Sequence, residues 1–189
     1  EKGNVLLTAI IDGTLLVINS NSFLIEFKFL IILSLLIFKI LSLIDNLNIK
    51  NIDKLNKNIA LIYRNYKKKP STCEISKFRN YCKKNNKKFL ISNYSDIAKK
   101  HRLDGFYIPA FNNKIYLNFL NKSNFIIIGS AHNLKEIRIK EKQGVQLILL
   151  SPLFKKKSNR PLGLYRYNIL SKLTKLPTVG LGGITKKNI

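Results

Sequence analysis

Residues 125–150 read FIIIGSAHNLKEIRIKEKQGVQLILL and contain one complete strand–helix–strand pattern. The run Phe125–Ile128 is short, apolar and uncharged, which is typical of a strand buried on both faces of a parallel sheet. Asn133 then predicts the start of a helix that ends before Gly144. A second uncharged run, Val145–Leu150, follows the helix. The stretch therefore predicts a βαβ unit.

The same alternation of apolar runs and charged segments extends from about residue 40 onwards. Five further runs, each uncharged and of strand length, are Ile40–Ile44, Ile59–Tyr63, Phe89–Ser92, Gly105–Ile108 and Thr178–Leu181. Between them, the capping box Ser71-Thr72-Cys73-Glu74 and the apolar spacing within Gly163–Leu173 predict helices. Seven strands with helical crossovers predict an α/β fold, either a doubly wound sheet or a (β/α)8 barrel, and the pattern leaves both open.

Residues 1–39 have a different composition. Two runs rich in β-branched residues, Val5–Ile11 and Thr14–Ile18, are joined by Asp12-Gly13, a pair that tolerates the positive φ angles of a type I′ turn. We therefore expect a β-hairpin near the start of this sequence.

The segment Phe23–Ile44 is nearly all Phe, Leu and Ile. Its longest uncharged run, Phe29–Phe38, is shorter than the roughly 20 residues that a membrane-spanning helix needs. A buried strand or helix is therefore the favoured interpretation, and contact between this N-terminal segment and a membrane is the alternative. We predict an apolar N-terminal extension over 1–39 and a barrel domain over 40–189.

The composition limits the partners. The chain has 189 residues, enough for one domain with a substantial core. Its 34 Lys and Arg against 10 Asp and Glu give a formal net charge of +24, which favours phosphorylated small molecules, a polyanion or an anionic membrane surface. The abundance of Lys, Asn and Ile is also typical of AT-rich coding sequences, so the charge does not by itself predict nucleic acid as a partner.

Cysteine and histidine are scarce. Cys73 and Cys82 are too far apart for a C-x-x-C motif, and the chain has 2 histidines. These counts argue against a His/Cys metal cage. Free thiols are typical of the reducing cytoplasm, where we expect this chain to be located.

In both α/β architectures, ligands bind at the carboxyl ends of the strands. The candidate residues that follow the predicted strands are Arg64, Asn93, Asn112, Ser130, His132, the basic loop 155–160 and Gly182-Gly183. A glycine pair lets backbone N–H groups approach an oxyanion closely, so Gly182-Gly183 is a candidate phosphate cradle. Arg64 either binds an anion or pairs with Asp45 or Asp104.

Ser130 and His132 are two residues apart and share one face of an extended segment, as a nucleophile and its base would. The sequence offers no matching acid. A helix-capping role beside Asn133 is therefore the favoured alternative.

Three blocks, in this order, resemble the thiamine-phosphate synthase and TenI family of (β/α)8 barrels. They are IGSAHNLKE at 128–136, SPLF at 151–154 with PLGL at 161–164, and LPTVGLGGIT at 176–185. The segment LDG at 103–105 fits the same register. The match extends over about residues 41–189 and implies an incomplete TIM barrel, with about seven of its eight βα units.

The resemblance implies a transferase of thiamine biosynthesis that joins hydroxymethylpyrimidine diphosphate to a thiazole phosphate and releases pyrophosphate. Such an enzyme mainly neutralises phosphates and positions two rings. Two alternatives remain open. One is a TenI-like isomerase that aromatises a thiazole phosphate tautomer, with His132 as its acid or base. The other is a non-catalytic binder of phosphorylated ligands.

The resemblance also implies roles for single residues. Arg64 matches a diphosphate contact of the family, and Ser130 matches a serine near the pyrimidine and the diphosphate. Gly182-Gly183 matches glycines that bind the thiazole phosphate. Lys157 and Arg160 lie in the loop where the family has a lysine that contacts pyrophosphate.

The sequence also departs from the family pattern. The family's second strand usually reads Gln-Leu-Arg-Glu-Lys, whereas residues 62–66 read IYRNY and keep only the arginine. The family holds magnesium with two aspartates, and the matching residues here are Asn93 and Asn112. Because Mg²⁺ prefers carboxylate oxygens, this pair predicts a weak Mg²⁺ site, with Asn93 also available to the substrate. Alternatively, the triple lysine 155–157 neutralises pyrophosphate instead.

Overall fold

The computed structural model describes the backbone of residues 5–11, 14–20, 40–52, 59–115, 125–154 and 160–183. The strands are β1 Val5–Ile11, β2 Thr14–Ser20, β3 Ile40–Ile44, β4 Ile59–Tyr63, β5 Lys88–Ser92, β6 Gly105–Ile108, β7 Ile126–Ala131, β8 Leu147–Leu150 and β9 Thr178–Gly180. The helices are α2 Ile49–Ile52, α3 Thr72–Lys84, α4 Ser95–Lys100, α5 Leu134–Lys142 and α6 Gly163–Lys172.

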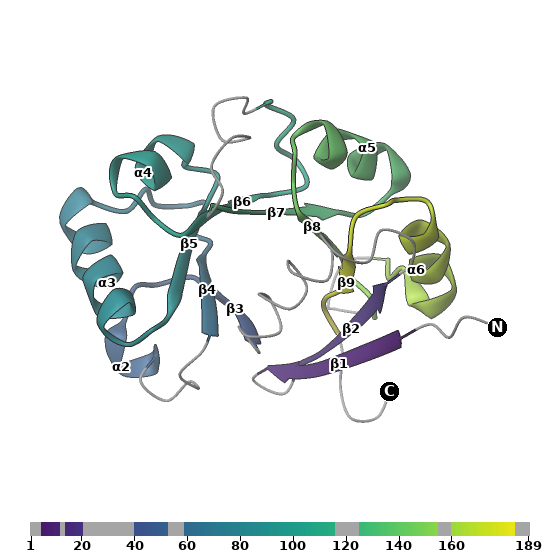
Figure 1. Cartoon of the computed structure of the whole chain (residues 1–189), viewed down its shortest axis with the longest axis horizontal. Helices are drawn as coiled ribbons and strands as arrows, with labels where there is room; N and C mark the ends of the chain where they lie inside the picture. Colours follow the sequence, from purple (N-terminus) through teal and green to yellow (C-terminus); the bar gives the residue numbers. More distant parts are fainter. Residues whose placement is uncertain are drawn as a thin grey trace.

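All these strands form one sheet in the order β1-β2-β9-β8-β7-β6-β5-β4-β3. The pairings from β3 to β9 are parallel, and the strand order follows the chain order without a reversal. Figure 1 shows this sheet curved into an arch with the described helices on its convex side. A doubly wound sheet reverses its strand order and has helices on both faces. The fold is therefore an incomplete (β/α)8 barrel.

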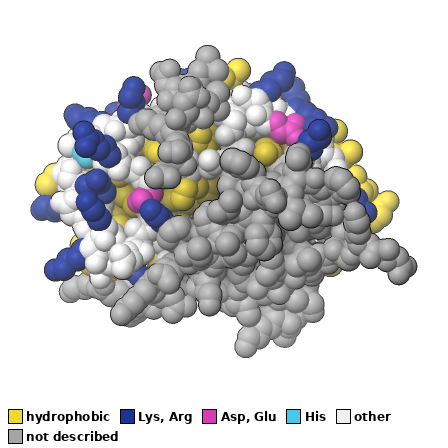
Figure 2. All heavy atoms as spheres, viewed as in Figure 1, with side chains coloured by type: hydrophobic (Ala, Val, Ile, Leu, Met, Phe, Trp, Pro, Cys, Tyr) yellow, Lys and Arg dark blue, Asp and Glu magenta, His cyan; other side chains and the backbone are white. Residues whose placement is uncertain are grey.

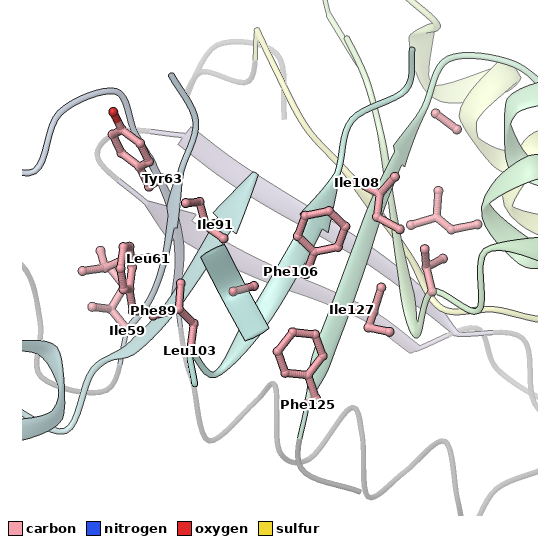
Figure 3. Packing of buried hydrophobic residues seen from close by; sticks show 14 of the residues in the cluster. Ile59, Leu61, Tyr63, Phe89, Ile91, Leu103, Phe106, Ile108, Phe125 and Ile127 are labelled. Atoms are coloured by element: carbon pink, nitrogen blue, oxygen red, sulfur yellow. The ribbon is translucent and has the colours of Figure 1, made fainter. Parts of the chain in front are cut away.

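Hydrophobic side chains pack on both faces of the parallel strands. On the convex face, Ile59, Leu61 and Phe89 are fully buried against the helical layer (Figure 3). On the concave face, a second cluster includes Ile62 and Tyr107. Burial on both faces explains why these strands are continuous apolar runs rather than alternating ones.

The local sequence sets where α3 begins. The Ser71 hydroxyl accepts from the backbone N–H of Glu74 at 3.2 Å, and the Ser71 N–H donates to the Glu74 carboxylate at 2.9 Å. Ile75, Phe78 and Cys82 lie on the buried face of the helix. The predicted capping box and its apolar face are confirmed.

The predicted N-terminal hairpin is also confirmed, because β1 and β2 pair antiparallel with Ile11 opposite Thr14. β2 pairs antiparallel with β9 as well, with Ile18 opposite Val179, so the hairpin continues the sheet beyond β9 (Figure 1). The apolar stretch 21–39 lies outside the described residues. Within the described part, no helix is long and apolar enough to cross a membrane. The division at residue 39 stays a prediction.

Several strand boundaries differ from the sequence prediction, and two of these differences have a clear cause. β7 continues past Ile128 to Ala131, because Gly129 and the two residues after it pair with β8. β8 begins only at Leu147, since the N–H of Val145 donates to the carbonyl of Lys140 at 3.3 Å and closes the end of α5. Ser130 is therefore within a strand and not in the loop that follows it.

Candidate functional site

Arg64 directly follows β4, at the carboxyl edge of the sheet, where its N–H donates to the carbonyl of Ile44 at 2.8 Å. Within the described part of the chain, its half-buried side chain forms no ion pair. Asp104 pairs instead with Lys88 at 3.0 Å, at the amino ends of β5 and β6. The alternative that Arg64 pairs with Asp45 or Asp104 is therefore wrong, and no carboxylate of the described residues neutralises the guanidinium.

Next to Arg64, a group of hydroxyls lines the concave face. The Ser130 side chain is buried and hydrogen-bonds to the phenol of Tyr107. Burial raises the pKa of Tyr107, while the Ser130 hydrogen bond and the positive charge of Arg64 lower it. Ser92 donates from its hydroxyl to the phenol oxygen of Tyr66 at 3.2 Å. These contacts place polar groups from four neighbouring strand ends around one position.

His132 follows β7 and is anchored at two points. Its N–H donates to the Glu136 carboxylate at 2.7 Å, and its ring Nδ1 hydrogen-bonds to the carbonyl oxygen of Ser151. Because a carbonyl only accepts, Nδ1 carries a proton, and in the neutral imidazole Nε2 is then the acceptor nitrogen. Asn133, rather than Ser130, caps α5 by accepting from the N–H of Glu136 at 2.9 Å. The described contacts include no hydrogen bond between Ser130 and His132.

The two asparagines at the predicted metal position contact each other. The Asn112 side-chain amide donates to Oδ1 of Asn93 at 2.6 Å, and Oδ1 of Asn112 accepts from the N–H of Lys114 at 2.9 Å. Both amide oxygens are therefore engaged in hydrogen bonds and neither carries a charge. Within the described ranges, no group of three or more His, Cys, Asp and Glu could hold a metal ion. These residues do not fit Mg²⁺.

The loop after β9 contains the predicted glycine pair. Gly182 has φ +96° and Gly183 has φ +72°, both in a region that L side chains rarely adopt. The Gly182 carbonyl accepts from the N–H of Phe154 at 3.0 Å, which places this loop beside the segment that follows β8. Arg160 is exposed, and Lys157 lies outside the described residues.

Sequence reasoning missed an aromatic pair at the same edge. The rings of Tyr66 and Phe111 meet edge to face with their centroids 5.3 Å apart, which joins the segment after β4 to the segment after β6. Tyr66 is 46% exposed and Phe111 is 64% exposed. Their places after two predicted strands were the available signal, but nothing in the sequence indicates that the two rings meet. Tyr107 was missed because it lies inside an apolar run.

Known proteins resemble this chain in both sequence and structure. A family model described as thiamine monophosphate synthase matches residues 54–189. A relative from Aquifex aeolicus with the thiamine-phosphate synthase name is 35% identical over 103 residues, 53% of this chain. The thiamine-phosphate synthase of Dictyoglomus turgidum is 29% identical over 153 residues, covering 74% of this chain and 68% of that protein. A solved thiamine phosphate pyrophosphorylase from Pyrococcus furiosus has a TM-score of 0.54 and 25% identity, covering 68% of this chain and 64% of that chain.

The chain spans 55% of the length of the Aquifex relative. The family model, in contrast, matches most of the chain, including β4 to β9 and all the candidate residues described above. The structural neighbour agrees with the curved parallel sheet. The chain belongs to the thiamine monophosphate synthase family.

Proposed function

We propose that this chain is a transferase that joins hydroxymethylpyrimidine diphosphate to a thiazole phosphate and releases pyrophosphate. The observation that carries this proposal is Arg64, a guanidinium at the carboxyl edge of the sheet with no ion pair in the described part of the chain. An arginine can bind a phosphate group through two parallel hydrogen bonds. Membership of the family supports the same substrate class.

In this reaction, the bond between the methylene carbon of the pyrimidine and the diphosphate oxygen breaks. The electron pair leaves with pyrophosphate, and the thiazole nitrogen supplies the pair for the new carbon–nitrogen bond. The protein then has to stabilise the departing charge and hold the two rings in line. We assign the first task to Arg64 with Lys157 and Arg160, and the second to Ser130 with Tyr107.

The glycine pair completes the assignment. Gly182 and Gly183 have backbone conformations suited to presenting N–H groups to a phosphate, and we assign them to the thiazole phosphate. Asn93 is a candidate hydrogen-bond partner for the diphosphate. The partners of the chain are then phosphorylated small molecules, and the proposed location is the cytoplasm.

Thiamine-phosphate synthases use Mg²⁺. Because Asn93 and Asn112 do not fit this ion, we propose that substrate binding in this chain does not depend on it. Figure 2 shows Lys and Arg side chains spread around the visible face with few Asp or Glu among them. The chain therefore has many positively charged side chains that can neutralise a diphosphate without a metal ion.

A second function is supported by His132. Its Nδ1 is committed to the Ser151 carbonyl, which leaves Nε2 to accept a proton at the carboxyl end of β7. A TenI-like isomerase needs one such acid or base and no diphosphate site. In that case, we expect His132→Asn to abolish turnover of a thiazole phosphate tautomer. Arg64→Gln should have no effect on diphosphate binding, because the unaltered chain would not bind a diphosphate.

The test is calorimetric titration with hydroxymethylpyrimidine diphosphate, with and without Mg²⁺, together with an assay for thiamine phosphate. We expect binding that is the same with and without Mg²⁺ and that weakens about tenfold, the equivalent of ~1.4 kcal/mol, in Arg64→Gln. The matched control is Arg166→Gln, because Arg166 is exposed on α6, outside the proposed site. Absence of binding in the unaltered chain would exclude the transferase. Binding without product would leave the non-catalytic binder.

A further inference from the structure

Helix α5 carries a lysine in an unusual environment. Lys140 has 0% of its surface exposed, and within the described part of the chain it forms no salt bridge. Its ammonium donates to the carbonyl oxygen of Asn112 at 2.7 Å and to Oε1 of Gln143 at 2.8 Å. Lysines are almost never fully buried unless they are paired, so these uncharged acceptors require an explanation.

Gln143, one turn further along, reaches the same loop. Its side-chain amide donates to the carbonyl of Asn112 at 2.9 Å and to the carbonyl of Lys114 at 2.7 Å. It is as deeply buried as Lys140, with 1% of its surface exposed. Lys140 of α5 and the C-cap residue Gln143 therefore hold two carbonyls of the loop 109–115 that follows β6.

The held loop leads into the candidate site. Asn112, whose carbonyl accepts from both of the side chains that hold the loop, donates from its own amide to Asn93 at 2.6 Å. The residue before it, Phe111, contacts the ring of Tyr66. A hydrogen-bonded path thus runs from Lys140 through Asn112 to Asn93, at the carboxyl edge of the sheet.

The strand next to α5 leaves room for this arrangement. A Cβ atom added to Gly129 of β7 would lie 2.8 Å from Cδ of Lys140 and 3.0 Å from a methyl group of Val145. Because such approaches are too close for a side chain, glycine at this position allows the stem of the lysine to pass across the strand. The absence of a side chain at Gly129 therefore provides the space that the buried Lys140 side chain occupies.

We propose that Lys140 and Gln143 are positioning residues of the ligand site, which hold the loop 109–115 so that Asn112 and Phe111 stay beside Asn93 and Tyr66. Neither side chain touches the proposed substrate. They act by donating hydrogen bonds to the backbone carbonyls of Asn112 and Lys114, which restricts the loop to one conformation. The link to ligand binding rests on the proposed function, whereas the link to the asparagine pair does not.

Two variants separate this role from general stabilisation. Lys140→Met keeps an unbranched side chain that is one atom shorter and removes its donors. Gln143→Glu keeps an acceptor for the Lys140 ammonium and adds an ion pair, yet it cannot donate to the carbonyls of Asn112 and Lys114. The matched control is Lys142→Met, because Lys142 is exposed on the same helix.

The first readout is the NMR signals of the Asn93 and Asn112 side-chain amides, assigned with Asn93→Asp and Asn112→Asp. We expect slow hydrogen exchange of the Asn112 amide in the unaltered chain and in Lys142→Met, and exchange faster by about tenfold or more in Gln143→Glu and Lys140→Met. Gln143→Glu carries the test if Lys140→Met does not fold. Unchanged amide signals in a folded Gln143→Glu would overturn the proposal.

The second readout is calorimetric affinity for inorganic pyrophosphate. We expect the affinity to fall by about tenfold in both variants and to stay constant in Lys142→Met. The reason is that residues of a ligand site lose their fixed positions when the side chains that hold them are removed. If the unaltered chain does not bind pyrophosphate, the proposed function fails while the amide signals still decide the positioning role. If affinity is unchanged although the amide signals change, the loop does not serve the ligand site, and that part of the proposal is wrong.

Discussion

The Asn112 side chain donates to Oδ1 of Asn93 across 2.6 Å, and this contact joins the loop after β6 to the end of β5. Two amides can form such a bond directly, because each has both donors and an acceptor. Two carboxylates at the same distance would repel each other unless a cation lay between them. The pair therefore replaces an ion-dependent contact with an ion-independent one.

The double substitution Asn93→Asp with Asn112→Asp tests this interpretation. We expect it to lower the free energy of unfolding by roughly 1–3 kcal/mol in the absence of metal, through the lost hydrogen bond and charge repulsion. Asn93 has φ +62°, which aspartate also tolerates, so the backbone should not change. Added Mg²⁺ should raise the melting temperature of the double variant and leave that of the unaltered chain constant. Equal Mg²⁺ effects on both proteins would contradict the assignment.

Phe111→Ala tests the aromatic pair. Because the Phe111 side chain is 64% exposed, its removal should change the free energy of unfolding by less than about 1 kcal/mol. If the pair contacts the ring of the substrate, affinity for hydroxymethylpyrimidine diphosphate should fall while affinity for pyrophosphate stays constant. Ile115→Ala is the control, since Ile115 is 58% exposed in the same loop. Equal losses for both ligands would show that the ring is not recognised by this pair.

The pH dependence of stability follows from Lys140. Burial lowers the pKa of Lys140 to about 8, whereas lysine in an unfolded chain titrates near ~10.4. Between these values the unfolded state binds more protons, so the free energy of unfolding should rise with pH, by up to about 1.4 kcal/mol per pH unit. Burial raises the pKa of the Cys82 thiol to about 12, which has the opposite effect at the upper end of this range.

The test therefore compares the free energy of unfolding of the unaltered chain with that of a variant without the lysine. Urea denaturation of the unaltered chain and of Lys140→Met from about pH 7.5 to 9.5 removes the contribution of Cys82, which both proteins share. The unaltered chain should gain stability relative to the variant as the pH rises. A difference that is flat over this range would mean that the lysine titrates normally in the folded protein.

The two thiols should react differently. Cys73 is exposed near the start of α3, whereas Cys82 is buried and its raised pKa keeps it protonated. We expect iodoacetamide to modify Cys73 in the folded chain and to reach Cys82 only after denaturation, as peptide mass spectrometry can show. Cys73→Ser serves as the control, because the folded variant should then remain unlabelled. Rapid labelling of Cys82 under native conditions would mean that α3 is not packed against the sheet.

Local patterns predicted most of the secondary structure. Uncharged runs became parallel strands because a sheet covered on both faces excludes charge, and the Asp12-Gly13 hairpin and the Ser71 capping box depend only on neighbouring residues. The predicted end of β7 at Ile128 was wrong. Gly129 and the residues after it are in a strand because β8 provides their partners, and no pattern within β7 itself indicates this.

The edge at which we expect ligands was likewise predictable, since it depends on strand direction alone, and Arg64, Ser130 and Gly182 stay predictions for that edge. The contacts at that edge were not. The Asn93–Asn112 and Lys140–Asn112 hydrogen bonds join residues 19 and 28 positions apart. By itself, the sequence determined the order of strands and helices, because that order arises from local periodicity, and the direction of the parallel strands then fixed which edge holds their carboxyl ends. Only the tertiary structure decided which side chains meet there, because the curvature of the sheet and the packing of α5 bring distant segments together.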